Sequence, residues 1–326
     1  MQRKCLLLSL SFASTVYGTY CCPPGISDHF LIETNWMYVR RSDVPERTLA
    51  VNTSILEANG DFEHVLKSEN LTHQWQWQTG LCGKLTYVSC EEASLEAIYF
   101  YVFPWTGRSV TGGNASLAFP FDDPDFTNDY NTASFVAAKY NSNLQNGEFN
   151  YWGHLTPRRI NYFSASWILG FRFMYLRERL NLAYTQSTDL SNYRIKTKNL
   201  LYGAQGGFVF EINPGPRWTW TVIMKGATFL NDARDDVFLG DENNTLIIRD
   251  FEKKRWAAAW LLEGVGSLTY QWYEHMNIHI GYQGILATGF ALAPKQLEKG
   301  SSTHRQIEAR SNMVLDGFFA GLTFSF

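Results

Sequence analysis

The stretch Asn312–Phe326, NMVLDGFFAGLTFSF, closes the sequence and decides between the possible folds. Its apolar side chains recur at every second position, namely at Val314, Phe318, Ala320, Leu322, Phe324 and Phe326. Successive side chains of a β-strand point to opposite faces, so this pattern predicts a strand with one apolar face and one mostly small, polar face. A soluble edge strand rarely exposes three phenylalanines, because such a face recruits other chains. The apolar face therefore belongs against a protein core or against lipid.

The composition is typical of β-structure with an aromatic surface. The chain has 326 residues, which suits two average soluble domains or one all-β barrel. Lys and Arg number 28 against 31 Asp and Glu, and the absence of a basic excess argues against a nucleic-acid-binding protein. Aromatic residues make up 16% of the chain, yet the mean hydropathy is −0.22. Apolar residues are therefore interleaved with polar ones, as they are in strands.

The amino terminus has the pattern of a secretory signal peptide. Arg3 and Lys4 precede a short apolar run, Cys5–Ala13, and Gly18 supplies a small residue for cleavage. We therefore expect residues 1–18 to be removed on export. A buried amino-terminal strand is the alternative.

Four cysteines remain after this cleavage, namely Cys21, Cys22, Cys82 and Cys90. Tyr20 stands where a lipoprotein signal needs a small residue, so a lipid anchor at Cys21 is disfavoured. An even number of cysteines in an exported chain permits disulfides. Cys82 and Cys90 lie on one extended run, roughly 27 Å apart, and cannot bridge each other. A disulfide from Cys21 or Cys22 to Cys90 is compatible with the sequence.

Ten segments alternate between apolar and polar residues and predict strands. The clearest is His73–Val88, where Trp75 and Trp77 share a face and glutamines occupy the other. The segment Trp256–Trp272 is the best candidate for a membrane helix, but it contains Glu263 and also alternates, so a strand is preferred over a buried helix. The ten predicted strands are residues 29–41, 73–88, 93–103, 148–155, 161–177, 192–213, 218–231, 252–271, 276–290 and 312–326.

The connections between these strands alternate strictly between long and short. The long ones are residues 42–72, 104–147, 178–191, 232–252 and 291–311, and the short ones are 89–92, 156–160, 213–217 and 272–275. A soluble sandwich has no reason for this alternation, whereas a transmembrane barrel has short periplasmic turns, long extracellular loops and an even number of strands. Lipid offers the backbone no hydrogen-bond partner, so such a sheet must close on itself.

The sequence therefore predicts an all-β fold, a transmembrane antiparallel up-and-down β-barrel of about ten strands in the bacterial outer membrane. Three segments follow: a signal peptide at residues 1–18, a periplasmic lead-in at residues 19–28 and the barrel at residues 29–326.

Several short motifs carry a resemblance to a known group. They are SWILGFRF at 166–173, KNLLYGAQ at 198–205, GYQ at 281–283 and ALAPKQ at 291–296. In these motifs the chain is similar to porin-like outer-membrane β-barrel proteins of planctomycetes and chlamydia-related bacteria, over most of its length after the signal. The resemblance implies an outer-membrane location and brings no catalytic residues.

The inward positions of the predicted strands carry charges of both signs. They are Glu96, Glu148, His154, Arg172, Glu211, Lys225, Arg255, Glu263 and His279. A ten-stranded barrel is little wider than an eight-stranded one, whose interior is filled by side chains. We therefore expect internal ion pairs that fill the lumen, with Arg172, Arg255 and Glu263 grouped at mid-barrel. A narrow pore for small solutes is the alternative.

An outer-membrane protease or lipid hydrolase is a second hypothesis. Such an enzyme needs a histidine beside a serine or an aspartate. His154, His275 and His279 are available, and Ser164 and Ser166 face inward. No motif orders these residues, so hydrogen-bonded polar side chains are the preferred interpretation.

Binding through the loops is a third hypothesis. Asp122, Asp123, Asp125 and Asp129 could offer carboxylate oxygens to Ca²⁺, but their spacing matches no EF-hand and a solvated loop is preferred. The sequence contains no CxxC or HExxH metal signature, and no cofactor is expected.

The predicted function is thus a narrow porin-like channel or structural surface protein, without enzymatic activity, that exposes loops 42–72 and 104–147. An enzyme, or an adhesin or receptor, is the alternative. The expected partners are outer-membrane lipid and small solutes or surface ligands, and nucleic acid is not among them.

Overall fold

The computed structural model describes residues 29–42, 44–57, 60–73, 75, 77–89, 93–120, 128–155, 162–186, 189–241, 246–297 and 306–326. Its strands are β1 (His29–Ser42), β2 (Thr48–Leu56), β3 (Phe62–Lys67), β4 (Gln78–Val88), β5 (Ala93–Ala118), β6 (Ala133–His154), β7 (Phe163–Gln186), β8 (Asp189–Gly215), β9 (Trp218–Asp241), β10 (Leu246–Tyr273), β11 (Met276–Ala291) and β12 (Ala309–Ser325). Its helices are α1 (Ser68–Thr72), α2 (Asn128–Asn131) and the 3-10 helix η2 (Ala293–Gln296). Within these ranges, no helix is long and apolar enough to cross a membrane.

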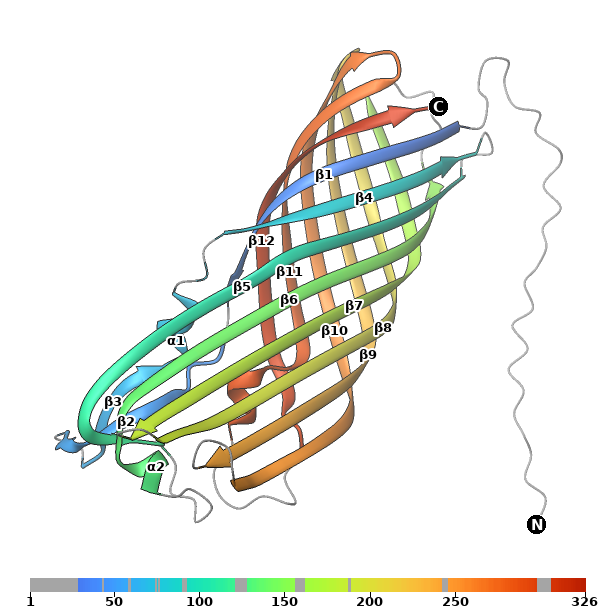
Figure 1. Cartoon of the computed structure of the whole chain (residues 1–326). Coiled ribbons are helices and arrows are strands. Elements are labelled where there is room, and N and C mark those ends of the chain that lie inside the picture. Colours follow the sequence, from blue (N-terminus) through green and yellow to red (C-terminus); the bar gives the residue numbers. More distant parts are fainter. Residues whose placement is uncertain are drawn as a thin grey trace, which may run out of the picture.

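The described strands form a single twelve-stranded sheet, and ten of them close it into a barrel (Figure 1). The ring runs in chain order through β1 and β4 to β12, with every neighbouring pair antiparallel. It closes where β12 pairs with β1, from Leu31 opposite Ser325 to Ser42 opposite Val314. The predicted antiparallel barrel of about ten strands is confirmed.

Two further strands lie inside the predicted loop 42–72. β2 and β3 form a hairpin, which joins β5 through Val51 opposite Ala118 and Asn52 opposite Leu117. Figure 1 shows this hairpin and α2 at the end of the barrel opposite the carboxyl terminus, with α1 part-way along the barrel. We call this end the far end, and the end with the carboxyl terminus and the β8–β9 and β10–β11 turns the short-turn end.

Three of the predicted long loops are mostly strand. The hairpins β5–β6, β7–β8 and β9–β10 continue, paired, through much of residues 104–147, 178–191 and 232–252. These boundaries were wrong because the apolar face changes sides along each strand. On β7, outward Leu169 and Phe171 are 59% and 51% exposed near the short-turn end, whereas at the far end inward Leu180 and Leu182 are buried and outward Arg177 is exposed.

The outward apolar side chains form a belt around the barrel. On β7 the belt runs from Phe163 to Tyr175, and on β9 from Trp218 to Leu230. At the usual rise along a strand and a barrel tilt of about 40°, this length corresponds to a height of roughly 30 Å. That height matches the hydrocarbon core of a bilayer, which is about 30 Å thick.

The predicted strand His73–Val88 is shorter in the structure, since β4 begins at Gln78. Trp75 enters the core, with its ring centroid 4.7 Å from that of Tyr140. Trp77 instead stacks on the outward Tyr38, at 5.5 Å between centroids. The prediction that Trp75 and Trp77 share a face was wrong, because the alternation of a paired strand does not extend to this lead-in.

A substitution at Gly264 should separate the effect of lipid from the effect of packing. Gly264 lies outward at mid-belt on β10, and a Cβ built there would meet nothing within 4 Å. Gly264→Arg should lower the free energy of unfolding by about 2–4 kcal/mol, because it places a charge in hydrocarbon. Gly264→Leu should leave stability unchanged or raise it slightly, since glycine weakens a strand interior. Urea unfolding in phosphatidylcholine vesicles measures both. Equal losses in the two variants would contradict a lipid-facing belt.

Candidate functional site

Four charged side chains meet inside the barrel at mid-height. Arg172 on β7 contacts Glu263 on β10 and lies 3.4 Å from Glu148 on β6, measured from Nη1 to Oε1. Lys225 on β9 completes the group, with its Nζ 2.9 Å from Glu148 Oε2 and 2.8 Å from Glu263 Oε1. All four side chains are at most 6% exposed. Two cations thus balance two carboxylates, and we call this group the charge cluster.

Inward amides surround the charge cluster. The guanidinium Nε of Arg172 donates to Asn146 Oδ1 at 2.6 Å, and Gln205 Nε2 donates to Glu148 Oε2 at 2.9 Å. Asn150 donates to the same Oε2 at 3.3 Å. The two bonds to Glu148 Oε2 add to the contact that Lys225 makes with the same oxygen, and such hydrogen bonds are what a buried charge requires.

Inward glycines make room for this group. A Cβ on Gly170 would lie 2.2 Å from Asn150 Oδ1, and a Cβ on Gly207 would lie 2.2 Å from the Met224 carbonyl oxygen. Packing around the cluster therefore requires glycine at positions 170 and 207.

A polar chamber of about 350 Å³ lies between the charge cluster and the short-turn end. Lys84 on β4 bridges Glu33 at 3.0 Å and Glu96 at 3.4 Å. His279 on β11 contacts Asn35, and its Nε2 lies 3.4 Å from a carboxylate oxygen of the same Glu33. The chamber can hold water or a small polar solute.

Apolar side chains close the lumen beside this chamber. Met37, Val39, Phe100, Val102, Ile285 and Leu315 point inward and are at most 6% exposed. The cavity left between them is about 10 Å³, close to the space needed for a single water. From there to the far end the described lumen is packed with one large cluster of buried apolar residues.

The connection between β11 and β12 contributes to this filling. Asn199 on β8 exchanges two hydrogen bonds with the backbone of Ala291, at 2.7 and 2.8 Å, and Asn231 on β9 donates to the Gly289 carbonyl at 2.8 Å. Beyond these bonds Leu292, Ala293, Pro294, Gln296 and Leu297 are all buried. We call residues 289–297 the plug. It contains the ALAPKQ motif of the sequence.

A second buried ion pair crosses the far half of the lumen. Arg41 on β1 lies 2.6 Å from Glu178 on β7, and neither side chain is exposed. Glu178 also accepts the Ala293 backbone N–H at 2.8 Å, which ties the plug to the pair. The guanidinium of Arg41 lies over the Trp75 ring, 5.2 Å from its centroid.

The structure brings together only part of the predicted lumen group. Arg172 and Glu263 are in contact, but Arg255 lies toward the far end and donates to the Ile307 carbonyl at 2.7 Å. The predicted inward residues Glu96, Glu148, Arg172, Lys225, Glu263 and His279 are buried, and His154, Glu211 and Arg255 are half-buried. Sequence reasoning missed Arg41, Glu178, Asn199 and Asn231, and it placed Glu178 in a loop. An inward polar residue within an otherwise apolar inward series is the signal that could have found them.

The two serines considered for an enzyme, Ser164 and Ser166, each have a hydrogen-bond partner on a neighbouring strand. His154 Nδ1 lies 2.8 Å from Ser166 Oγ, and the two residues are direct cross-strand neighbours. Ser166 is buried, and neither residue lines the polar chamber. Ser164 instead donates to Glu211, at 2.8 Å.

Other predicted residues lie elsewhere. Cys82 is a free thiol that lines the chamber. Cys21, Cys22 and Cys90, named for a possible disulfide, lie outside the described residues, as do Asp122, Asp123 and Asp125 of the acidic loop. Asp129 falls in α2.

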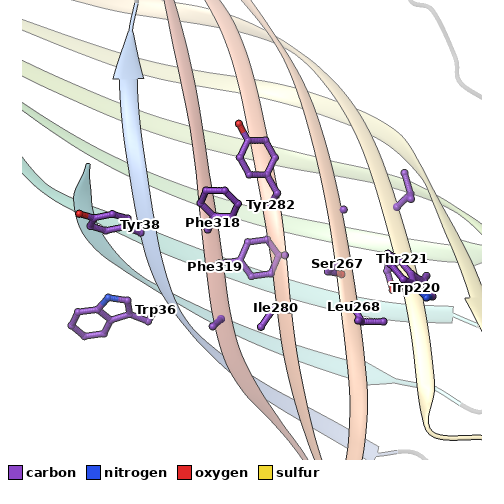
Figure 2. Close-up of a pocket in the computed structure, with 14 residues that line it drawn as sticks. Trp36, Tyr38, Trp220, Thr221, Ser267, Leu268, Ile280, Tyr282, Phe318 and Phe319 are labelled. Atoms are coloured by element: carbon purple, nitrogen blue, oxygen red, sulfur yellow. The ribbon is translucent and has the colours of Figure 1, made fainter. Parts of the chain in front are cut away.

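A groove of about 740 Å³ lies on the outer face of β9 to β12 and β1. Figure 2 shows aromatic side chains around it, including Trp36, Tyr38, Phe318 and Trp220. Gly266 and Ala320 leave the space between them. No carboxylate, amine or imidazole lines the groove, so it is part of the apolar belt and offers no catalytic chemistry.

Comparisons with known proteins show the fold. No protein-family model matches the sequence, and no curated protein matches it significantly. The chain is similar to the outer membrane protease OmpT of Escherichia coli, with 9% identity over 93% of this chain and 99% of that chain, and a TM-score of 0.51. It is also similar to the translocator domain of the autotransporter NalP of Neisseria meningitidis, with 9% identity, 93% and 89% coverage and a TM-score of 0.38. Ail of Yersinia pestis gives 7% identity, 92% and 100% coverage and a TM-score of 0.28.

The likeness to OmpT is enough to assign an outer-membrane-type β-barrel and is too distant to transfer any activity. The two lower scores add nothing to that assignment. The narrower resemblance to proteins of planctomycetes and chlamydia-related bacteria stays a prediction.

Substitutions in the charge cluster should show its dependence on charge balance. Arg172→Met leaves Lys225 alone between Glu148 and Glu263, and removing one partner of a buried pair costs about 3–5 kcal/mol. We expect a loss of that size in the free energy of unfolding, measured by urea unfolding in vesicles. The double variant Arg172→Met, Glu263→Gln restores neutrality and should be more stable than the single variant. If the double variant is the less stable of the two, the cluster is not held by charge balance.

Proposed function

We propose that this chain is an outer-membrane β-barrel protein with a closed lumen, and that it acts as a structural surface protein. The short-turn end faces the periplasm and the far end faces the cell exterior, as in barrels with short periplasmic turns. The observation that carries the proposal is the apolar filling of the far half of the lumen.

Within the described residues, this filling occupies the route that a solute would need through the lumen. The polar chamber ends at Met37, Val39, Phe100 and Val102, where only about 10 Å³ remains. Beyond them the plug and the inward leucines and tyrosines of β6 to β9 pack together. An ion that crossed this region would lose its hydration without a polar partner, which is strongly unfavourable. The geometry therefore favours a structural role over the narrow channel.

The far half is also built like a soluble protein. Its strands present polar and charged side chains outward, such as Lys139, Asn141 and Arg179, around the apolar interior. The resulting β-extension would project from the membrane as a folded platform with β2, β3, α1 and α2 on it. Such a platform would present an exposed protein surface outside the membrane, which a ligand can contact.

Single-channel recording tests the closed lumen. The refolded, signal-free protein in a planar bilayer should give no steady conductance, because no continuous water path crosses the apolar region. Heat-dependent gel mobility of the same sample establishes that the barrel has folded, and a known open porin provides the positive control. A steady small conductance from folded protein would restore the narrow-channel function.

Cysteine labelling tests location and orientation. In a background in which Cys21, Cys22, Cys82 and Cys90 are all replaced by serine, Lys139→Cys lies outward on the β6 extension and Glu274→Cys lies in the turn between β10 and β11. A polyethylene-glycol maleimide too large for porins should label Lys139→Cys in intact Gram-negative cells, and Glu274→Cys only after lysis. The reverse pattern would contradict the orientation, and equal labelling of both in intact cells would contradict membrane insertion.

A further inference from the structure

Four cations lie directly opposite one another on the outer face of β7 to β10. Arg177 pairs in register with Lys198, Lys198 with Arg234, and Arg234 with Lys254. We call these four residues the basic row. Arg177, Arg234 and Lys254 are exposed and Lys198 is half-buried. Like charges directly across a strand pair destabilise a sheet, so this arrangement requires anions nearby.

The chain supplies only part of the required negative charge. Asp232 lies 3.1 Å from both Arg234 and Lys254 and supplies a counter-charge to the β9–β10 half of the row. In the part of the chain that the structure describes, no ion pair joins Arg177 or Lys198 to a carboxylate. The β7–β8 half of the row therefore lacks a counter-charge from the protein.

Neighbouring residues make the deficit larger. One step toward the far end, Arg179 lies opposite Lys196, and only Lys196 has an acidic partner, Asp236 at 2.9 Å. These two rows together contain six cations and two carboxylates, Asp236 and Glu252, and Asp232 in the adjoining row toward the short-turn end adds a third carboxylate. The patch thus carries three excess positive charges on a chain whose formal net charge is −3.

The basic row sits at the edge of the apolar belt. One step toward the short-turn end, the outward positions are Tyr175, Leu200 and Trp256, with Asp232 between the last two. Lys254 Nζ lies 4.8 Å from the centroid of the Trp256 ring. If the membrane placement proposed above holds, on which this inference rests, the row lies at the boundary between hydrocarbon and water in the outer leaflet.

We propose that the basic row binds the phosphate groups of an anionic lipid in the outer leaflet, with the acyl chains of that lipid on the belt below. Arginine can hold a phosphate through two parallel N–H bonds, and lysine adds a point charge. Four neighbouring strands span about 14 Å, which leaves room for more than one phosphate. Free phosphate would satisfy the cations but would make no use of the adjoining apolar surface, so the structure favours a lipid.

Lipid titration with native mass spectrometry tests the proposal. Folded protein in detergent is titrated with dioleoylphosphatidic acid or dioleoylphosphatidylcholine, and the apparent Kd is read from the bound populations. The phosphatidic acid should bind more tightly than phosphatidylcholine. The double variant Arg177→Gln, Lys198→Gln should weaken phosphatidic acid binding by about 30-fold, from two lost cations near the lipid surface.

A matched control removes the same charge elsewhere on the outer face. Lys139 on β6 and Arg310 on β12 lie outside the basic row, and Lys139→Gln, Arg310→Gln should leave the Kd nearly unchanged. Equal weakening by the two double variants would overturn the proposal, as would displacement of the lipid by inorganic phosphate at equal concentration. Heat-dependent mobility is checked for every variant. Failure of the parent protein to enter vesicles would overturn the proposed function together with this inference, whereas insertion without lipid preference would overturn this inference alone.

Discussion

The structure depends on one constraint, which is that a sheet surrounded by lipid can leave no backbone hydrogen-bonding group unpaired. The pairing of β1 with β12 meets this requirement, because it removes both edges of the ten-stranded ring. The carboxyl-terminal stretch Asn312–Phe326 is therefore an inner member of the wall, with β1 on one side and β11 on the other. Phe318, which is 57% exposed, can point outward because no free edge accompanies it.

The same strands serve two environments along their length. Near the short-turn end they carry apolar side chains outward and a polar interior inward, and beyond the belt they carry polar side chains outward and an apolar core inward. The charge cluster lies where the interior changes from polar to apolar, and its neutrality allows it to be buried there. The basic row marks the corresponding change on the outer face. The cluster lies at the level of mid-belt Gly264, whereas the basic row lies at the edge of the belt.

Alternating apolar residues were enough to predict the fold class and the ring of ten strands, because period-two patterns and alternating connection lengths are local properties of the sequence. Arg172 and Glu263 could be grouped because both are inward charges on membrane strands. Arg255 was grouped wrongly, since nothing local shows how far along a strand a residue lies relative to its neighbours. Glu178 and Asn199 could not be found as partners of Arg41 and the plug, because register across strands depends on the closed ring. The basic row was missed for the same reason, as its members are far apart in sequence.

The plug has a consequence for how the protein is made. It lies in the connection between β11 and β12, and β12 is also the strand that closes the ring. A chain whose last hairpin has not yet joined the sheet is therefore an open trough, with the leucines and tyrosines of β6 to β9 accessible to solvent. Insertion of the plug and closure of the wall belong to one late event, because both involve the same hairpin. The nascent barrel thus needs protection from self-association until β12 has been synthesised and has joined the wall.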